Sequence, residues 1–409
     1  MFKYFLTILL GIGLLGCSDN EEPISKSSAS LSEEYNVSIQ LIKDFGKTHS
    51  CPTLTKSTSS SDLIIKDVRS KVYYFEVEDS IVNRSPRLQR LSSNSDSLSV
   101  TLYTVEFEKN GNSGFAIASG DERISNVYAY TENGQLSDTL YNVGLKYTLA
   151  NIENVCKDEL IRYYNQPKTT ATATPLLVQP FTNLEWNQTA PYNQLAKVCS
   201  SAGWAYAGRC PAGCTTIAVA QAVAWLLPPK VTGFYLESLR KIKSYPLGAT
   251  TGDWVSNMAN YIRYIGNCVN IEYSCEGSGA LIKNIRDEFD TWGIHYSYAE
   301  DKNVDLDMLA YNLVKELPHI TSGFTKKPRK GHSWIWEGID CMLTGTTDGH
   351  SRLYLDYSVT PKLYCNWGWG GSSNGWYVSY EQPEGHDKPY LDDNCQLYIT
   401  GTSFSRPAN

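Results

Sequence analysis

The chain contains a cysteine in a setting that favours nucleophilic chemistry. Cys214 stands where a loop with Pro211 and Gly213 meets a stretch rich in small residues, which predicts a helix over 215–227 ended by Pro228. A helix N-terminus offers unpaired backbone N–H groups and the positive end of the helix dipole. Both favour a thiolate and lower the cysteine pKa. A buried structural cysteine explains this stretch alone equally well, because free cysteines are commonly buried.

A thiolate nucleophile needs a base that accepts its proton, a group that orients the base, and donors for an oxyanion. Of the six histidines, His332 and His350 each lie in a Gly-His-Ser triplet. His350 follows a predicted turn, which indicates a solvated side chain. His332 precedes an alternating run, 333–339, that predicts a buried strand and hence a fixed direction for the imidazole. His332 is therefore the candidate base, with an ordinary histidine at a strand end as the alternative.

Asn366, Trp367 and Gln188 are candidates for the supporting roles. Asn366 lies in a predicted strand over 362–367, and its amide oxygen could hold the imidazole. Trp367 could shield that hydrogen bond from water, although a Gly/Trp turn such as the one that follows is, taken alone, more often a structural tight turn than a site. Gln188 lies in a polar loop, where its NH2 group could donate to an oxyanion. A surface glutamine is the usual case, so this assignment needs independent support.

The elements that must position these side chains fall into two units. The first unit, 35–175, predicts a small antiparallel sheet with helices and contains no catalytic constellation. Its predicted helices cover 35–45 and 141–164, and its predicted strands cover 71–77, 100–107, 114–120 and 126–130, with an Asn-Gly hairpin turn at 109–112. Residues 166–175 are rich in Thr and Ala without periodicity, and they predict a protease-accessible linker. The second unit, 176–409, adds predicted strands over 333–339, 351–358, 362–367 and 375–378.

Composition narrows the class of protein. A length of 409 residues and a hydrophobic content of 42% allow two or three domains with sizeable cores. The net charge of −7 and the absence of a basic stripe exclude a general nucleic-acid binder. The cysteines form no paired CxxC motifs, so we expect no metal site.

The first seventeen residues predict a targeting segment. Lys3 precedes an apolar run, 5–15, that is shorter than the ~20 residues needed to span a bilayer. The run ends in Leu-Leu-Gly-Cys, which resembles a bacterial lipobox with Cys17 as the lipidated residue. A cleaved secretory signal is the alternative. Residues 18–34 are polar, Ser-rich and acidic and predict a flexible tether. The acidic cluster also resembles surface-export signals of some outer-membrane lipoproteins.

Export makes disulfides possible, but sequence alone does not determine their pairing. Ten cysteines follow Cys17, and at least one besides a reactive Cys214 would stay free. Cys210, four residues before Cys214, could form a bridge with Cys199 or respond to redox conditions.

The second unit contains four short motifs whose order along the chain is informative. They are Trp-Asn-Gln-x-x-Pro-Tyr-Asn at 186–193, Gly-Cys-x-x-x-Ala-x-Ala-Gln at 213–221, Gly-His at 331–332 and Asn-Trp-Gly-Trp-Gly-Gly-x-x-x-Gly at 366–375. Together they resemble the streptopain family of bacterial papain-fold cysteine endopeptidases. The first unit is similar to the propeptide of that family, notably over 103–107 and 114–121.

The resemblance implies an α+β, papain-like fold, with a helical subdomain and an antiparallel β subdomain, preceded by a small α+β propeptide domain. It implies that Cys214 is the nucleophile and His332 the general base and then acid. It further implies that Asn366 orients His332, and that Gln188 and the Cys214 backbone N–H form the oxyanion hole. The family's Gly-Cys pair favours Cys214 over Cys210, and this chemistry requires no cofactor.

The segment 276–280 is similar to the family's Gly/Ser-rich segment beside the substrate. There Ser278 and the backbone of Gly331, with Trp367 over the His–Asn pair, are the substrate-binding candidates. By resemblance, an apolar side chain is favoured two residues before the scissile bond. Ser333 stands where the family usually has Ala, Glu337 stands where it has Asp, and the segment between His332 and Asn366 is longer. These departures concern specificity rather than the Cys–His pair.

The predicted organisation is a signal peptide over 1–17, a tether over 18–34, an inhibitory propeptide domain over 35–175 and a peptidase domain over 176–409. The expected activity is proteolysis by a zymogen with protein or peptide substrates and its own propeptide as inhibitor. The expected location is the outer membrane or cell surface, through a lipid on Cys17, with release of the peptidase domain by processing. An acyltransferase or transglutaminase-like enzyme and a catalytically silent binding lipoprotein are the alternatives.

Overall fold

The computed structural model describes residues 22–23, 33–49, 62–75, 98–165, 173–300, 304–326, 329–344, 353–379 and 393–405. The predicted signal peptide with Cys17, most of the predicted tether and His350 lie outside these residues. No helix in the described ranges is long and apolar enough to cross a membrane.

The first unit forms the predicted antiparallel sheet with helices. Its strands are β2 (Ile64–Phe75), β3 (Leu98–Lys109), β4 (Asn112–Ser119) and β5 (Asn126–Thr131), and a short β1 (Glu22–Pro23) pairs with β2. Its helices are α1 (Glu33–His49), the 3-10 helix η1 (Leu136–Leu140), α4 (Val143–Ala150) and α5 (Ile152–Asn165). The predicted turn at 109–112 is confirmed, because Asn110 and Gly111 both have positive φ angles. The helix predicted over 141–164 is instead two helices separated at Asn151.

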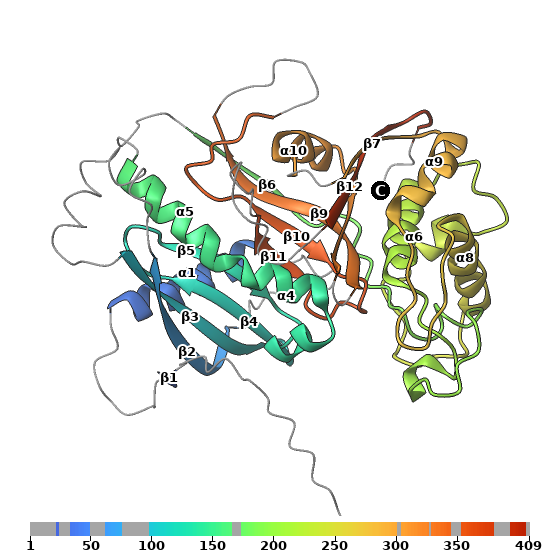
Figure 1. The fold of residues 1–409 in the computed structure, drawn as a ribbon, viewed down its shortest axis with the longest axis horizontal. Coiled ribbons are helices and arrows are strands. Elements are labelled where there is room, and N and C mark those ends of the chain that lie inside the picture. The colour runs from blue at the N-terminus through green and yellow to red at the C-terminus, as the bar shows by residue number, and fades with distance from the viewer. Residues whose placement is uncertain are drawn as a thin grey trace, which may run out of the picture.

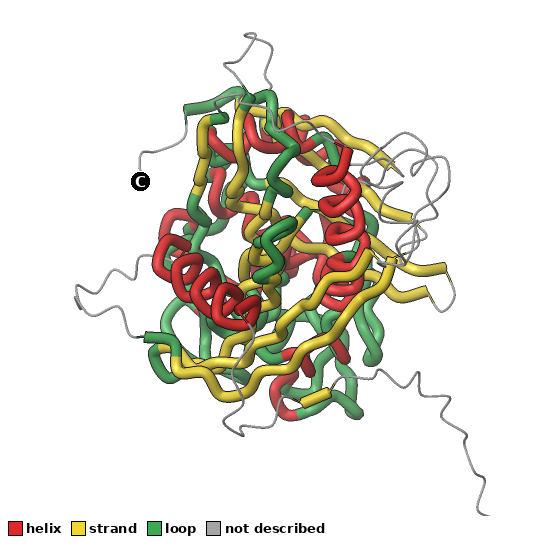
Figure 2. Tube along the Cα trace, turned by 90° about the vertical axis from the view of Figure 1, so that its left-hand side faces the viewer, coloured by secondary structure: helices red, strands yellow, loops and turns green. Residues whose placement is uncertain are grey.

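Alternation along the strands of the first unit gives the sheet two apolar faces. Val100 and Leu102 of β3 pack in the same hydrophobic cluster as residues of α4 and α5. Val105 and Phe107 of the same strand pack in the cluster that contains Ile42 of α1. The sheet therefore lies between α1 and the α4–α5 pair, and Figure 2 shows strands running between helices on both sides.

The second unit consists of a helical part and the remaining strands. Its helices are η2 (Trp204–Tyr206), α6 (Cys214–Leu226), α7 (Leu236–Leu239), α8 (Val255–Cys268), η3 (Ile282–Ile285), α9 (Arg286–Trp292) and α10 (Leu306–Val314). Its strands are β6 (Thr174–Val178), β7 (Ile294–Glu300), β8 (His319–Lys326), β9 (Arg329–Leu343), β10 (Lys362–Asn366), β11 (Gly375–Val378) and β12 (Asp393–Thr402). In Figure 1, α6, α8 and α9 gather at one end of the molecule, opposite the first unit, with the β9–β12 strands between them. The predicted α+β class is confirmed.

The two units share one sheet, which the sequence did not predict. The strand order is β1-β2-β3-β4-β5-β11-β10-β9-β8-β12-β7, with β6 added beside β9. The junction is the antiparallel pairing of β5 with β11, where Trp376 lies opposite Tyr130 and Tyr377 lies opposite Ala129. One hydrophobic cluster also contains residues from both units, such as Leu145 of α4 and Trp336 of β9. The first unit is thus docked through backbone pairing and a shared core.

Two local predictions are wrong. Thr174 and Pro175, predicted as linker, begin β6 and pair with Leu343 and Met342 of β9. The strand predicted over 351–358 is reduced, among its described residues, to an isolated bridge between Leu355 and Leu343, followed by a turn. In both cases the partner strand, rather than local composition, decides the conformation.

A single disulfide joins Cys199 to Cys275 among the described residues. The bridge that we considered between Cys199 and Cys210 is therefore not the one formed, and Cys210 is a buried free thiol.

Candidate active site

Cys214 occupies the position that the sequence predicts, as the first residue of α6. The helix owes its start to Gly213, whose φ of 90° and ψ of 133° suit only glycine. A Cβ on Gly213 would lie 2.6 Å from Ile271 Cδ1 and 3.2 Å from the Ser278 carbonyl oxygen. Every residue of α6 after Cys214 is buried, whereas Cys214 itself is partly exposed. A buried helix thus presents one partly exposed sulfur at its N-terminus.

His332 lies in β9, between β8 and β10, and its side chain is buried. A direct bond between α6 and β9 sets its distance from the cysteine. The Ser333 hydroxyl donates to Thr215 Oγ1 at 2.9 Å, and Thr215 in turn donates to the Ala280 carbonyl at 2.9 Å. The residues that follow Cys214 and His332 are therefore tied together, and the His332 side chain lies close enough to lower the pKa of the Cys214 thiol.

The pKa of the Cys214 thiol reflects this pairing. Burial raises it, but the electrostatic attraction and the hydrogen bond of His332 outweigh burial. Hydrogen bonds from the Ser333 and Thr215 backbones act in the same direction, and the pKa falls from 9.0 to about 7. Near neutral pH a large fraction of the sulfur is therefore thiolate, the nucleophilic form.

The group that holds the His332 imidazole differs from the one predicted. Its Nε2 lies 2.8 Å from the backbone carbonyl oxygen of Trp367. A carbonyl only accepts hydrogen bonds, so Nε2 carries the hydrogen, and Nδ1 is left as the nitrogen that can accept a proton. The expected hydrogen bond from the His332 imidazole to the Asn366 amide oxygen is not formed, because the backbone carbonyl of the next residue accepts it instead.

The Asn366 side chain instead braces the turn behind the histidine. Its Nδ2 donates to the Leu184 carbonyl at 2.6 Å and lies 3.3 Å from Gln221 Oε1 and 3.5 Å from Glu337 Oε1. Its Oδ1 accepts the backbone N–H of Gly368 at 3.2 Å. Asn366 is fully buried, so these bonds fix the backbone on both sides of the Trp367 carbonyl. It supports His332 indirectly.

Three tryptophan rings surround the imidazole. The centroids of Trp367, Trp334 and Trp369 lie 6.2, 6.2 and 5.9 Å from the His332 centroid, with Trp334 and Trp369 nearly parallel to it. We predicted Trp367 alone. The alternation of β9, which directs Trp334 to the same face as His332, was the signal that could have identified a second ring. The rings keep water from the His332–Trp367 bond.

Gln188 carries an unpaired donor. Its side chain is 5% exposed, and its Nε2 atom is buried without a hydrogen-bond partner. The Gln188 carbonyl accepts the Ala212 N–H at 2.9 Å, which joins its loop to the segment before Cys214. A buried unpaired N–H group is costly and rare in folded proteins. This atom is therefore available to a group that the free protein lacks.

The other substrate-binding candidates lie on either side of the pair. Ser278 is buried in the loop that packs on Gly213, and its hydroxyl accepts the Ser274 N–H at 3.4 Å. Gly331 is exposed in β9 next to His332, opposite Phe324 of β8. The structure thus brings both near the Cys–His pair.

Helix α4 of the first unit lies directly on the site, which the sequence did not reveal. A Cβ on Gly144 would lie 2.6 Å from Trp367 Cζ3 and 3.2 Å from His332 Cδ2. Asn142 caps this helix by accepting the Leu145 N–H at 3.0 Å. Only a residue without a side chain allows the helix to approach the imidazole so closely.

Hydrogen bonds hold the first unit beside the Gly/Trp turn. Asp138 accepts hydrogen bonds from Ser372 at 2.9 Å and Ser373 at 2.7 Å. Thr131 donates to the Asn374 carbonyl at 2.7 Å. The turn that carries the Trp367 carbonyl is therefore bonded to the first unit at several points.

Comparison with known proteins agrees with the geometry. Residues 186–377 match the profile described as the Peptidase C10 family, which is the streptopain family. The match confirms the predicted resemblance and supports a peptidase, a hydrolase, as the class of activity. No curated protein matches the chain.

A solved structure of a prointerpain A fragment from Prevotella intermedia aligns with 80% of this chain and 98% of its own. The sequence identity is 16% and the TM-score is 0.49.

Proposed function

We propose, on the premise that residues 186–377 form a domain similar to the C10 peptidases, that the chain is the zymogen of a cysteine endopeptidase. The observation that carries this proposal is the placement of Cys214 beside His332, held by the hydrogen bond between Thr215 and Ser333, with the imidazole fixed by the Trp367 carbonyl. Such a pair supplies both the thiolate and the acid that protonates a leaving amine.

In the proposed reaction, the Cys214 thiol passes its proton to His332 Nδ1, and the resulting thiolate attacks the carbonyl carbon of a peptide bond. The oxyanion that forms accepts hydrogen bonds from Gln188 Nε2 and from the Cys214 backbone N–H at the start of α6. His332 then donates a proton from Nδ1 to the leaving amine. Water, deprotonated by the same nitrogen, releases the acyl group and restores the thiol. The unpaired Gln188 donor supports this assignment, because it lacks a partner until substrate binds.

The first unit acts as the inhibitory propeptide in this proposal. Helix α4 covers His332 and Trp367 through Gly144, so a substrate cannot approach the imidazole from that side while the helix is docked. Processing would cut the chain between Asn165, the last residue of α5, and Thr174, the first residue of β6. The pairing of β6 with β9 would then keep the new N-terminus attached to the peptidase domain.

We further propose that Cys17 carries a lipid and that the chain is exported to the outer membrane or cell surface. The supporting observation is the Leu-Leu-Gly-Cys sequence at 14–17 after a short apolar run. Metabolic labelling with a fatty acid, lost in Cys17→Ser, would test this part separately.

The test of the activity is incubation of the purified full chain with an unfolded protein. Self-cleavage between residues 165 and 174 and hydrolysis of the substrate are both expected. The inactive control is Cys214→Ala, and Cys210→Ala is the matched cysteine variant that should stay active. Cleavage that survives Cys214→Ala, or that is lost only in Cys210→Ala, contradicts the proposed nucleophile.

A further inference from the structure

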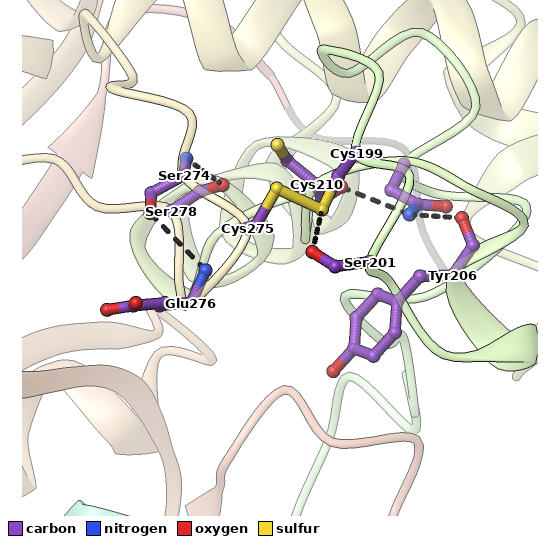
Figure 3. The surroundings of a disulfide bond; sticks show 9 residues. Cys199, Ser201, Tyr206, Cys210, Ser274, Cys275, Glu276 and Ser278 are labelled. Carbon is purple, nitrogen blue, oxygen red and sulfur yellow. Dashed lines mark hydrogen bonds between the residues drawn. A yellow bond between two sulfur atoms is a disulfide. The ribbon is translucent and has the colours of Figure 1, made fainter.

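A third cysteine lies beside the disulfide. Cys199 and Cys275 are bonded, while Cys210 has a free thiol, and the three sulfur atoms all lie within 4.8 Å of one another. Figure 3 shows the Cys210 side chain next to the sulfur–sulfur bond. None of the proposed catalytic roles uses these residues.

The backbone holds Cys199 and Cys210 on one face of a small antiparallel ribbon. Val198 and Arg209 form a bridge, the Cys199 N–H donates to the Gly208 carbonyl, and the Cys210 N–H donates to the Lys197 carbonyl, both at 2.8 Å. Positions 199 and 210 each lie one step from the bridged pair, so their side chains leave the same face.

Burial distinguishes the three sulfur positions. Cys199 and Cys210 are 2% and 1% exposed and form an apolar cluster with Ala196. Cys275, in contrast, is exposed. Water therefore reaches only one of the three residues freely.

Cys275 lies in a short loop that touches the start of α6. The backbones of Glu272 and Gly279 close this loop with hydrogen bonds of 2.9 and 3.1 Å. On its far side, the Ser278 carbonyl lies against Gly213, immediately before the nucleophile. The disulfide thus ties the exposed end of this loop to the ribbon.

We propose that Cys210 exchanges with this disulfide and thereby releases the loop. The Cys210 thiolate attacks Cys199 Sγ, a new Cys199–Cys210 bond forms, and the Cys199–Cys275 bond breaks with its electron pair on Cys275. The Cys275 thiolate takes up the proton that Cys210 lost. One disulfide and one thiol exist before and after, so the step needs no oxidant or reductant.

Solvation favours this direction of exchange. A thiolate is stabilised by water, and the leaving sulfur is the exposed one, whereas the sulfurs of the product disulfide are buried. Attack begins from a buried thiol, so exchange should be slow, on the order of minutes to hours. The released loop includes Ser278, and its effect on substrate binding rests on the proposed peptidase function.

The exchange itself is tested without any peptidase activity. The full chain carrying Cys214→Ala is incubated at mildly alkaline pH without added thiol, quenched with acid, alkylated and mapped by mass spectrometry. A growing Cys199–Cys210 peptide with alkylated Cys275 supports the proposal. In the additional variant Cys275→Ser, treated with oxidised glutathione as the oxidant, the Cys199–Cys210 bond should form completely.

Two outcomes overturn the proposal. One is a Cys199–Cys275 bond that persists unchanged while Cys210 stays alkylated, together with two free thiols in Cys275→Ser. The other is a map in which all three cysteines are alkylated and none is bonded, which would leave a three-thiolate metal site as the interpretation.

The consequence for the loop is tested in the active chain. Cys210→Ser, which locks the Cys199–Cys275 bond, should keep the kcat and KM that the native chain has before exchange, while Cys275→Ser should raise KM by about fivefold at similar kcat. Equal KM values in the two variants contradict loop release. A disulfide map that shows no exchange does not affect the peptidase assignment. A native chain without peptidase activity does not affect the disulfide map.

Discussion

Gly144 offers a sharp test of how the first unit blocks the site. Helix α4 meets the imidazole and the Trp367 ring at this position, where an added methyl group would lie 2.6 Å from Trp367 Cζ3 and 3.2 Å from His332 Cδ2. Trp367 is fully buried and its Nε1 donates to the Ser373 carbonyl at 2.8 Å. The ring therefore cannot move aside, and the helix must move instead.

Two effects of Gly144→Ala oppose each other, and their magnitudes decide the outcome. Alanine favours a helix by about 1 kcal/mol relative to glycine. Overpacking against a rigid core costs about 1–3 kcal/mol, and the short contact with a fixed ring places this site near the upper end, at about 3 kcal/mol. The net cost of about 2 kcal/mol weakens docking of the first unit by about 30-fold.

The assay is hydrolysis of a fluorogenic peptide by the purified full chain before processing. Gly144→Ala should raise the initial rate and shorten the lag before self-processing, and Gly144→Leu should do so further. Lys146→Ala, which changes an exposed residue of the same helix, is the matched control and should behave like the native chain. After processing, kcat/KM should be the same for all variants. If Gly144→Ala keeps the native lag and initial rate, α4 is not what restrains the site.

Four further predictions concern the peptidase domain. Burial raises the pKa of Cys214, but His332 lowers it to about 7. Alkylation by iodoacetamide should therefore reach half its maximal rate near pH 7. In His332→Ala the pH of half-maximal alkylation should move towards 9. Gln188→Ala should lower kcat by about 100-fold or more with little change in KM, as measured on the processed enzyme; an unchanged kcat would exclude Gln188 from the oxyanion hole. Ser333→Ala removes the hydroxyl bonded to Thr215, at a cost of about 1 kcal/mol, and should lower Tm by about 2 °C while activity persists. Burial raises the pKa of Glu337 from 4.5 to about 7, so the folded chain binds this proton more tightly than the unfolded chain. Stability should therefore fall as the pH rises from 4.5 to about 7. Glu337→Gln should flatten this part of the profile of Tm against pH, and an unaltered profile would contradict the assignment.

Local patterns were sufficient to predict most elements of the first unit and, in the second unit, helix α6 and parts of β9, β10 and β11. The Asn-Gly turn between β3 and β4, the alternation along β9 and the prolines after α6 act over a few residues, so they are legible in the sequence. The order of the motifs around Cys214 and His332 was enough to favour these residues over Cys210 and His350.

What the sequence did not predict depends on residues far apart in the chain. The pairing of β5 with β11, which joins both units in one sheet, brings together residues 129–130 and 376–377. The choice of Cys275 over Cys210 as the partner of Cys199 depends on a loop that folds back over 76 positions. Neither contact can be predicted from neighbouring residues in the sequence, because its energy comes from packing between segments that are far apart in the chain.

The hydrogen bond that holds His332 shows most clearly which features the sequence predicts and which depend on the tertiary structure. The sequence by itself predicted an imidazole next to a buried strand segment and an Asn-Trp pair near the end of another strand. Only the tertiary structure decided that the Trp367 carbonyl, rather than the Asn366 amide, holds Nε2. The reason is physical: a backbone carbonyl belongs to every residue, so its role depends on where the turn directs it and not on the type of side chain.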